Sequence, residues 1–459
     1  MNLSKELARF VAQTTFNDLP PEVIETQKKS VMDAVAITFG AGALGDGCRE
    51  MIRISEELSA HGDPESTVIG FGKKLPASWA AFANASMAHS LDFGDTHQGS
   101  TIHSNSSSFP AALAVAERLG KITGQDLLTA LVVGSETAIR IAMASDTNST
   151  EDGFYPPTIY SSYGAAAAVA KILGLSEEQI ISAFSFTLCQ TMGSSELTNN
   201  PRTAVRSVRE AFAARNAIVS GYMAKESMIG FSDPLEGKLG FYHTFLHDKY
   251  TPERALDGLG SRYEAADLTF KAWPCCFGTH SAITAVLSMM KEGLFTAGEI
   301  RHIQVSIGAQ NKMLFEPLAE RRNPETSIIG KFSIPFTLAE AILHGNVTLS
   351  SFSQESLHDR QVRELASRID YTYMEDWQRG KETWTTLEVR TDTDTFVRHE
   401  TTPLGTPGRP MAREDFDSKF DACASLCVSP KTPEDLRQIK STILALDSLD
   451  DIRDLTALL

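Results

Sequence analysis

The sequence predicts a mainly α protein with a large all-helical domain and a smaller α+β domain. Apolar residues recur at helical spacing through most of the first 260 positions, and strand-like alternation appears only later. A Pro- and Gly-rich stretch near residue 405 then precedes a helical tail. The chain has 459 residues, which is too many for one ordinary core, so two or three domains are expected.

Residues 1–261 are predicted to form the first part of the helical domain. Pro20 and Pro21 open a helix whose apolar positions recur near 3.6 spacing, and Pro76 opens an Ala-rich helix. The stretch 163–173 is apolar on several faces, which favours a buried helix.

A short polar stretch interrupts these helices. Residues 99–108 are small and polar, and Pro110 follows them. Because proline suits the first turn of a helix, the sequence predicts a loop through residue 108 and a new helix from Pro110.

Residues 262–402 are predicted to form the smaller α+β domain. Apolar and polar residues alternate at 303–307 and again at 387–389, as they do in strands. A turn at 392–394 leads to a further strand at 395–401. A helix at 334–343 lies between them. Residues 403–459 begin as a linker and continue as a C-terminal helical segment that is expected to return to the helical domain.

Composition excludes several classes of protein. The formal net charge is -16, whereas a nucleic-acid partner needs a basic face. No apolar run has the length of a membrane span, and no secretory signal is visible, so no membrane partner is expected. The six Cys form no CxxC set, which favours reduced thiols in a cytoplasmic protein. A local group of Arg and Lys could still bind an anion.

The stretch from Asn84 to Glu117 gathers acid and base side chains. Asp92 and His103 are the first candidates, because a carboxylate near an imidazole can orient it and raise its basicity. The alternative is a helix cap for Asp92 and a surface loop for His103. His89 fits a packed structural histidine better, and His97 stays undecided.

Four further residues could contribute to such a site. Arg206 and Arg209 lie three apart and could grip a carboxylate, or they could form a solvated basic face. Lys271 precedes an apolar, aromatic stretch, where a lysine either snorkels or is a partly buried charge. Tyr155 lies in a loop, where it could pack or could transfer a proton.

Motifs for the common nucleotide, phosphate and serine-hydrolase sites are absent from the sequence. There is no GxGxxG after a strand, no GxxxxGK[ST] and no GxSxG. The His residues are scattered and no HExxH occurs, so no metal is expected.

The central stretch resembles the signature of the MmgE/PrpD family, which includes 2-methylcitrate dehydratase, cis-aconitate decarboxylase and iminodisuccinate epimerase. The resemblance rests on His89, the run Leu91–His97, His103 and Pro110–Glu117. Downstream it continues through AFAARN (211–216), DPLEGKLGF (233–241), Lys271 with Pro274 and His280, KFSIPF (331–336) and the GTPGRP…KF pattern (405–420). It covers essentially the whole chain.

The resemblance implies a helical domain, a smaller lid domain and a pocket between them. It also implies a homodimer that works without metal or organic cofactor on a small anionic carboxylate. By motif, the pocket residues of the decarboxylase correspond to Asp92, Thr96, His103 and Lys271. His97 and Arg209 are added as substrate-binding candidates.

Three positions depart from the family pattern. Tyr155 stands where the decarboxylase has a His, Arg206 where it has a Lys, and Gly94 where an Asp is common. The shared chemistry would be removal of a proton next to a carboxylate, with cations stabilising the resulting charge. An epimerase needs two proton-transfer groups on opposite faces of one carbon, and His103 and Tyr155 could form that pair.

These departures slightly favour an epimerase or racemase resembling iminodisuccinate epimerase. The alternative is a lyase, similar to the dehydratase or the decarboxylase, in which an acid helps a hydroxyl to leave or carbon dioxide is lost. A binding protein that uses the same fold without catalysis is the third possibility.

Overall fold

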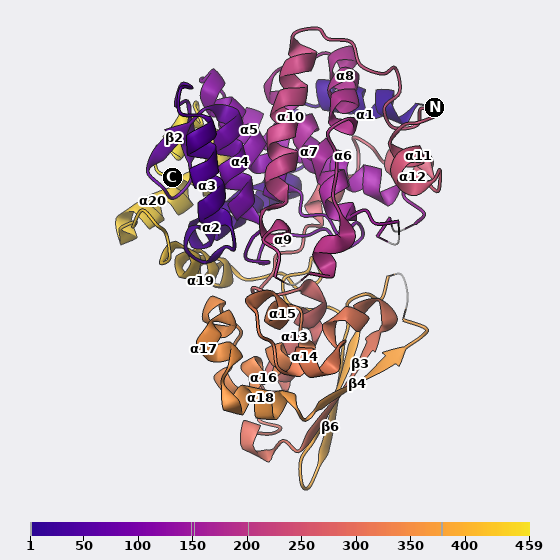
Figure 1. The fold of residues 1–459 in the computed structure, drawn as a ribbon, viewed down its shortest axis with the longest axis vertical. Helices are drawn as coiled ribbons and strands as arrows, with labels where there is room; N and C mark the ends of the chain where they lie inside the picture. The colour runs from indigo at the N-terminus through magenta and orange to yellow at the C-terminus, as the bar shows by residue number, and fades with distance from the viewer. Residues whose placement is uncertain (1, 148, 151, 201, 378–379) are drawn as a thin grey trace. The chain divides into compact units, whose positions relative to one another are not determined.

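The computed structural model describes residues 2–147, 149–150, 152–200, 202–377 and 380–459, which form two compact units. The first unit contains the chain up to Thr269 together with Arg413–Leu459, and the second contains Phe270–Ala412 (Figure 1). The fold is mainly α with a smaller α+β part, and the predicted fold class is confirmed.

The units divide after Thr269 and Ala412, where the sequence analysis placed the boundaries after residues 261 and 402. Local hydrogen bonds explain both positions. The carbonyl of Arg262 accepts from buried Arg140 (2.5 Å), which keeps this segment with the first unit. The carbonyl of Gly405 accepts from the N–H of Phe270 (2.9 Å), which keeps the Pro- and Gly-rich stretch with the second.

The first unit is helical, with one short antiparallel hairpin of β1 and β2. Its elements are α1 (Leu3–Gln13), α2 (Pro21–Leu44), α3 (Cys48–Leu58), β1 (Ser66–Val68), β2 (Lys73–Leu75), α4 (Ala77–Ala88), α5 (Asn105–Leu119), α6 (Gly124–Met143), α7 (Pro156–Ile172), α8 (Glu177–Leu188), α9 (Val205–Val208), α10 (Glu210–Lys225), α11 (Phe241–Leu246), α12 (Pro252–Leu256), α19 (Arg413–Ala424), α20 (Pro433–Leu444) and α21 (Arg453–Thr456).

Helix α7 lies at the centre of this unit and packs against α5, α6 and α10 (Figure 1). Its small residues permit a close approach, since a Cβ atom at Gly164 would lie 2.8 Å from the carbonyl oxygen of Gly134 on α6. The Ala-rich stretch that follows is buried on all sides, as its composition predicts.

The second unit is a four-stranded sheet with helices. Its elements are α13 (His280–Lys291), β3 (His302–Gly308), α14 (Leu318–Arg322), α15 (Ser327–Lys331), α16 (Ile334–His344), α17 (Gln354–Leu357), α18 (Arg360–Ala366), β4 (Ile369–Met374), β5 (Thr385–Arg390) and β6 (Thr395–Glu400). The strand order is β4-β3-β5-β6, with β4 parallel to β3 and the other pairs antiparallel. Val305 faces Leu387 across the sheet, and both are fully buried in its core.

One local prediction is corrected, and one strand was missed. Helix α5 begins at Asn105 rather than at Pro110, so Pro110 lies inside the helix. The loop prediction holds for residues 99–104, but residues 105–108 are helical. Buried hydrogen bonds hold two of them there: Asn105 donates to Gln27 (2.9 Å), and Ser107 donates to Glu210 (3.3 Å). Strand β4 was not predicted.

Within the part of the chain that the structure describes, no single helix is both long and apolar enough to cross a membrane. One bent pair, α2 with α3, meets the criterion by length and composition alone.

Candidate functional site

The turn after α4 places Asp92 in an unusual backbone conformation. Its φ is +52°, in the left-handed region that only Gly, Asn and Asp adopt readily. The Asp92 N–H donates to the carbonyl of His89 (3.0 Å), and the side chain is buried. Such strained positions are concentrated at functional sites.

His89, Asp92 and His103 form one cluster in the first unit. The Nε2 atom of His89 lies 3.7 Å from Oδ1 of Asp92, and the rings of His89 and His103 have centroids 4.1 Å apart. The two strongest candidates of the sequence analysis therefore meet through His89, which is 1% exposed. His89 is buried, as expected for a packed histidine, and it contacts both residues.

His103 is held in one tautomer. Its Nδ1 lies 2.8 Å from the backbone carbonyl of Asp95, which can only accept, so Nδ1 carries the proton. In the neutral ring, Nε2 is then the basic nitrogen. The side chain is half-buried, so His103 has the geometry of a general base, or of an acid once protonated.

His97 and Thr96 fasten the loop that carries His103. The N–H of His97 donates to the carbonyl of Ile102 (2.9 Å), and its Nδ1 is 2.9 Å from the hydroxyl of Ser100. Burial lowers the pKa of His97. Thr96 exchanges two backbone hydrogen bonds of 2.8 Å with Thr269. Both residues have structural contacts that explain their burial.

Tyr155 immediately precedes α7, and its ring packs against Arg209. The guanidinium carbon of Arg209 lies 5.1 Å from the ring centroid. Arg209 is only 3% exposed, donates to the carbonyl of Arg206, and has Nε 3.2 Å from Oε1 of Glu210. Burial raises the pKa of Glu210. Arg209 therefore supports Tyr155, while Arg206 is half-buried.

A chain of contacts links Tyr155 to the helix that follows His103. Ser107, on the first turn of α5, donates to Glu210 (3.3 Å), and Glu210 pairs with Arg209. Arg209 in turn contacts the ring of Tyr155. The structure thus brings the His103 segment, α9, α10 and the start of α7 together in the first unit.

Lys271 belongs to the second unit and is 3% exposed. Burial raises the pKa of the nearby Cys275 thiol to about 12, while Lys271 and Lys331 act in the opposite direction. Lys331, at the end of α15, is also buried, and its carbonyl accepts from the N–H of Cys276 (2.9 Å). The sequence analysis treated Lys331 only as part of KFSIPF, where a lysine beside an apolar run was the available signal.

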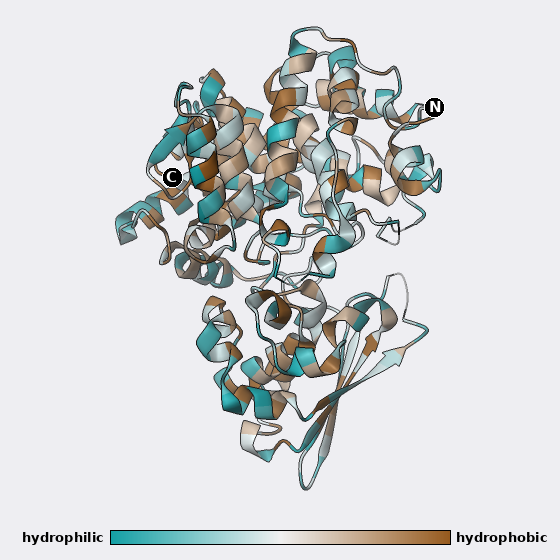
Figure 2. Cartoon of the chain, viewed as in Figure 1, coloured by the Kyte–Doolittle hydropathy of each residue, from teal (hydrophilic) through white to brown (hydrophobic). Residues whose placement is uncertain are grey.

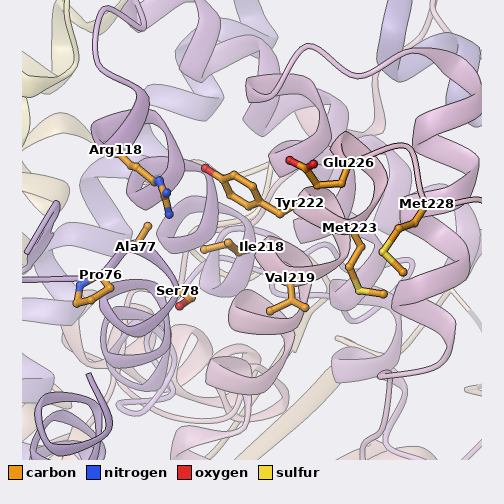
Figure 3. Close-up of a pocket in the computed structure, with 10 residues that line it drawn as sticks. All are labelled: Pro76, Ala77, Ser78, Arg118, Ile218, Val219, Tyr222, Met223, Glu226 and Met228. Carbon is orange, nitrogen blue, oxygen red and sulfur yellow. The ribbon is translucent and has the colours of Figure 1, made fainter. Parts of the chain in front are cut away.

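An open groove of about 410 Å³ lies on the first unit, away from these residues (Figure 3). Arg118 lies 5.2 Å from the ring centroid of Tyr222, and α10 supplies most of the apolar lining. The lining residues are Pro76, Ala77, Ser78, Arg118, Ile218, Val219, Tyr222, Met223, Glu226 and Met228. None of the predicted site residues is among them.

Comparisons with known proteins find matches to one family in both units of the chain. Residues 5–253 match the MmgE/PrpD N-terminal domain, and residues 273–444 match the MmgE/PrpD C-terminal domain. The chain is similar to cis-aconitate decarboxylase of Aspergillus terreus, with 26% identity over 100% of this chain and 96% of that protein. For cis-aconitate decarboxylase of Homo sapiens the identity is 28%, over 100% and 94%. For 2-methylcitrate dehydratase of Escherichia coli (strain K12) it is 23%, over 66% of each chain.

Proposed function

The chain belongs to the MmgE/PrpD family, and from this premise we propose that it is a lyase that removes carbon dioxide from cis-aconitate or a closely related unsaturated tricarboxylate. The observation that carries the proposal is the extent of similarity. The cis-aconitate decarboxylases match all of this chain, whereas the 2-methylcitrate dehydratases match two thirds of it.

The comparisons favour the lyase alternative over the epimerase that the sequence analysis slightly favoured. The named relatives are a decarboxylase and a dehydratase, and both activities are lyase activities. Tyr155 and Arg206 then become candidates for substrate selection rather than evidence for a second proton-transfer group.

Three residues have the chemistry for the proposed reaction. Loss of carbon dioxide leaves the bonding electron pair on carbon, where a conjugated carboxylate can delocalise it. A cation must balance that charge, and Lys271 and Arg206 are the candidates. The carbon then takes a proton, which protonated His103 can give from Nε2 because Nδ1 is engaged with Asp95. One tricarboxylate and one proton thereby yield one dicarboxylate and carbon dioxide.

Dehydration is the second candidate, supported by the similarity to 2-methylcitrate dehydratase. In that reaction neutral His103 accepts a proton from the carbon next to a carboxylate, and a hydroxyl leaves as water. Tyr155, whose ring contacts Arg209, could supply the proton that the hydroxyl needs.

Proton NMR in deuterated water separates these reactions. The enzyme is incubated with cis-aconitate, 2-methylcitrate and dicarboxylates that carry one proton next to a carboxylate. The proposal expects a deuterium-labelled dicarboxylate and carbon dioxide from cis-aconitate. A new alkene from 2-methylcitrate would favour the dehydratase, and exchange without elimination would restore the epimerase.

A matched pair of variants tests the role of His103. His103→Gln should lower kcat by roughly 10²–10⁴-fold, because it removes the proton-transfer group. His61→Gln alters an exposed histidine outside the site and should leave kcat unchanged. Equal rates for the two variants would contradict the assignment.

We also propose that the protein is a homodimer that associates through α10. Hydrophobic residues occur among hydrophilic ones along this helix (Figure 2). Val219 and Phe212 are 41% and 43% exposed on it, and Ile229 beyond its end is 93% exposed. Exposed apolar surface of this kind often marks an interface.

Light scattering of two charge variants tests the dimer. Val219→Glu should give a monomer, because it places a charge on the proposed interface. Val428→Glu has the same 41% exposure but lies in the C-terminal segment, and it should remain a dimer. A dimeric Val219→Glu protein would exclude this face. A cytoplasmic location remains part of the proposal, supported by six free cysteines.

A further inference from the structure

The sequence pattern ending in Lys419-Phe420 has no part in the proposed chemistry, yet Lys419 reaches the site. It lies on α19, in the segment that returns to the first unit. Its Nζ donates to the backbone carbonyl of Phe93 (2.6 Å) and lies 3.9 Å from the centroid of the Phe93 ring. The ammonium therefore contacts both the carbonyl and the ring of the residue that follows Asp92.

A buried carboxylate accompanies this lysine. Oδ1 of Asp33, on α2, lies 2.5 Å from Nζ of Lys419, and the two side chains are 1% and 4% exposed. Such a buried pair gives little net stability, because desolvation of both charges offsets their attraction. The Asp33–Lys419 pair instead fixes the position of the Phe93 carbonyl.

Two more residues of α2 contact the chain on either side of His103. Ser30 donates to the carboxylate of Asp95, and Asn105 donates to Ser30 (2.7 Å) and to Gln27 (2.9 Å). Gln27, Ser30 and Asp33 recur every three residues along the helix, so they share one side of it. Ser30 thus contacts the turn before His103, Gln27 and Ser30 contact the helix after it, and Asp33 pairs with Lys419.

We propose that Lys419 and Asp33 are positioning residues that hold Asp92 in its left-handed conformation and so present its carboxylate to the His89 ring, which in turn contacts the ring of His103. The ammonium of Lys419 binds the backbone carbonyl of Phe93. One peptide group joins Phe93 to Asp92, where φ is +52°. This inference rests on the proposed function only in that Asp92 takes part in turnover.

The test compares three variants of the full-length protein. Lys419→Met removes the contact with Phe93. Asp33→Asn/Lys419→Met removes it together with the charge of the buried carboxylate, so this variant is expected to fold even if the single variant does not. Lys28→Met is the control, because Lys28 also links α2 to the C-terminal segment through Asp447 (2.8 Å) and is 6% exposed.

Two measurements are made on each variant. Both Lys419 variants should lower kcat on the active substrate by about 10- to 100-fold with KM changed less than about threefold, because Asp92 is displaced while other binding groups remain. Lys28→Met should keep the wild-type kcat. Hydrogen exchange should become faster in a peptide covering residues 89–98 for the Lys419 variants alone.

The outcomes separate the two proposals. Unchanged kcat in the double variant, or equal losses in the double variant and Lys28→Met, would overturn the positioning role. If the wild-type protein converts none of the carboxylates, the proposed function fails. The exchange measurement then decides the positioning role alone, because it needs no turnover: selective acceleration at 89–98 supports it, and equal protection contradicts it.

Discussion

Asp92 combines a buried carboxylate, a left-handed backbone and a histidine 3.7 Å away. Asp92 therefore has two roles, one for its backbone conformation and one for its carboxylate. The backbone conformation costs free energy for residues with a Cβ, and the short polar side chains of Asp and Asn reduce that cost through local hydrogen bonds. The carboxylate supplies the charge next to the His89 imidazole.

Substitutions at Asp92 should separate these roles. Asp92→Asn should keep the free energy of unfolding, whereas Asp92→Ala should lower it by about 1–2 kcal/mol because alanine resists φ near +52°. Asp92→Gly should be more stable than Asp92→Ala. All three should lose turnover. Urea unfolding followed by circular dichroism measures the stabilities, and equal stability of the Ala and Gly variants would contradict the strain argument.

The cysteines offer a residue-scale prediction about pH. Burial raises the pKa of Cys48 to about 11 and that of Cys275 to about 12, whereas Cys189 is exposed. At pH 8 the thiolate fraction of Cys48 is therefore about 10⁻³, and it rises tenfold for each pH unit up to its pKa. Alkylation followed by mass spectrometry should label Cys189 first. Early labelling of Cys48 in the folded protein would contradict this order.

At the scale of elements, α6 holds the segment that leads to Thr269. Arg140 is fully buried and donates to the carbonyls of Ala255 (2.9 Å), Asp257 (2.9 Å) and Arg262 (2.5 Å). Its Nε pairs with Glu136 (2.6 Å). The helix thereby fixes the end of α12 and the residues that follow it by satisfying their backbone acceptors.

Removal of this arginine should be costly. Arg140→Met leaves Glu136 buried without its charged partner and should lower the free energy of unfolding by about 3–5 kcal/mol. Arg53→Met breaks an exposed pair with Glu50 and should cost at most about 1 kcal/mol. Denaturant midpoints with unchanged m-values measure both. Similar midpoints for the two variants would exclude the structural role of Arg140.

At the scale of the whole molecule, the C-terminal segment completes the first unit. Phe420 packs edge-on against Phe39, with ring centroids 6.1 Å apart. Gly70 donates to the carbonyl of Leu459 (3.0 Å) and accepts from the N–H of Ser429 (2.9 Å). The first unit therefore uses both ends of the chain, while the second uses one continuous segment.

A chain ending after Ala412 should lose the first unit selectively. Without α19 to α21, the buried faces of Phe39 and its neighbours are exposed to water, so this unit should not unfold cooperatively. The second unit keeps all of its own strands and helices. Hydrogen exchange by mass spectrometry should show protection confined to 270–412. Full protection of both units would contradict this division.

Periodicity and motifs predicted the mainly α class, the strand positions of β3, β5 and β6, and the residues proposed for the chemistry, because both are local properties of the chain. The start of α5 was predicted five residues too late, because the buried partners of Asn105 and Ser107 come from distant parts of the chain. Strand β4 was missed, although its parallel partner β3 was found. The contact of Lys419 with the turn at Asp92 joins residues 326 positions apart, and such a contact exists only when folding brings both segments into one core.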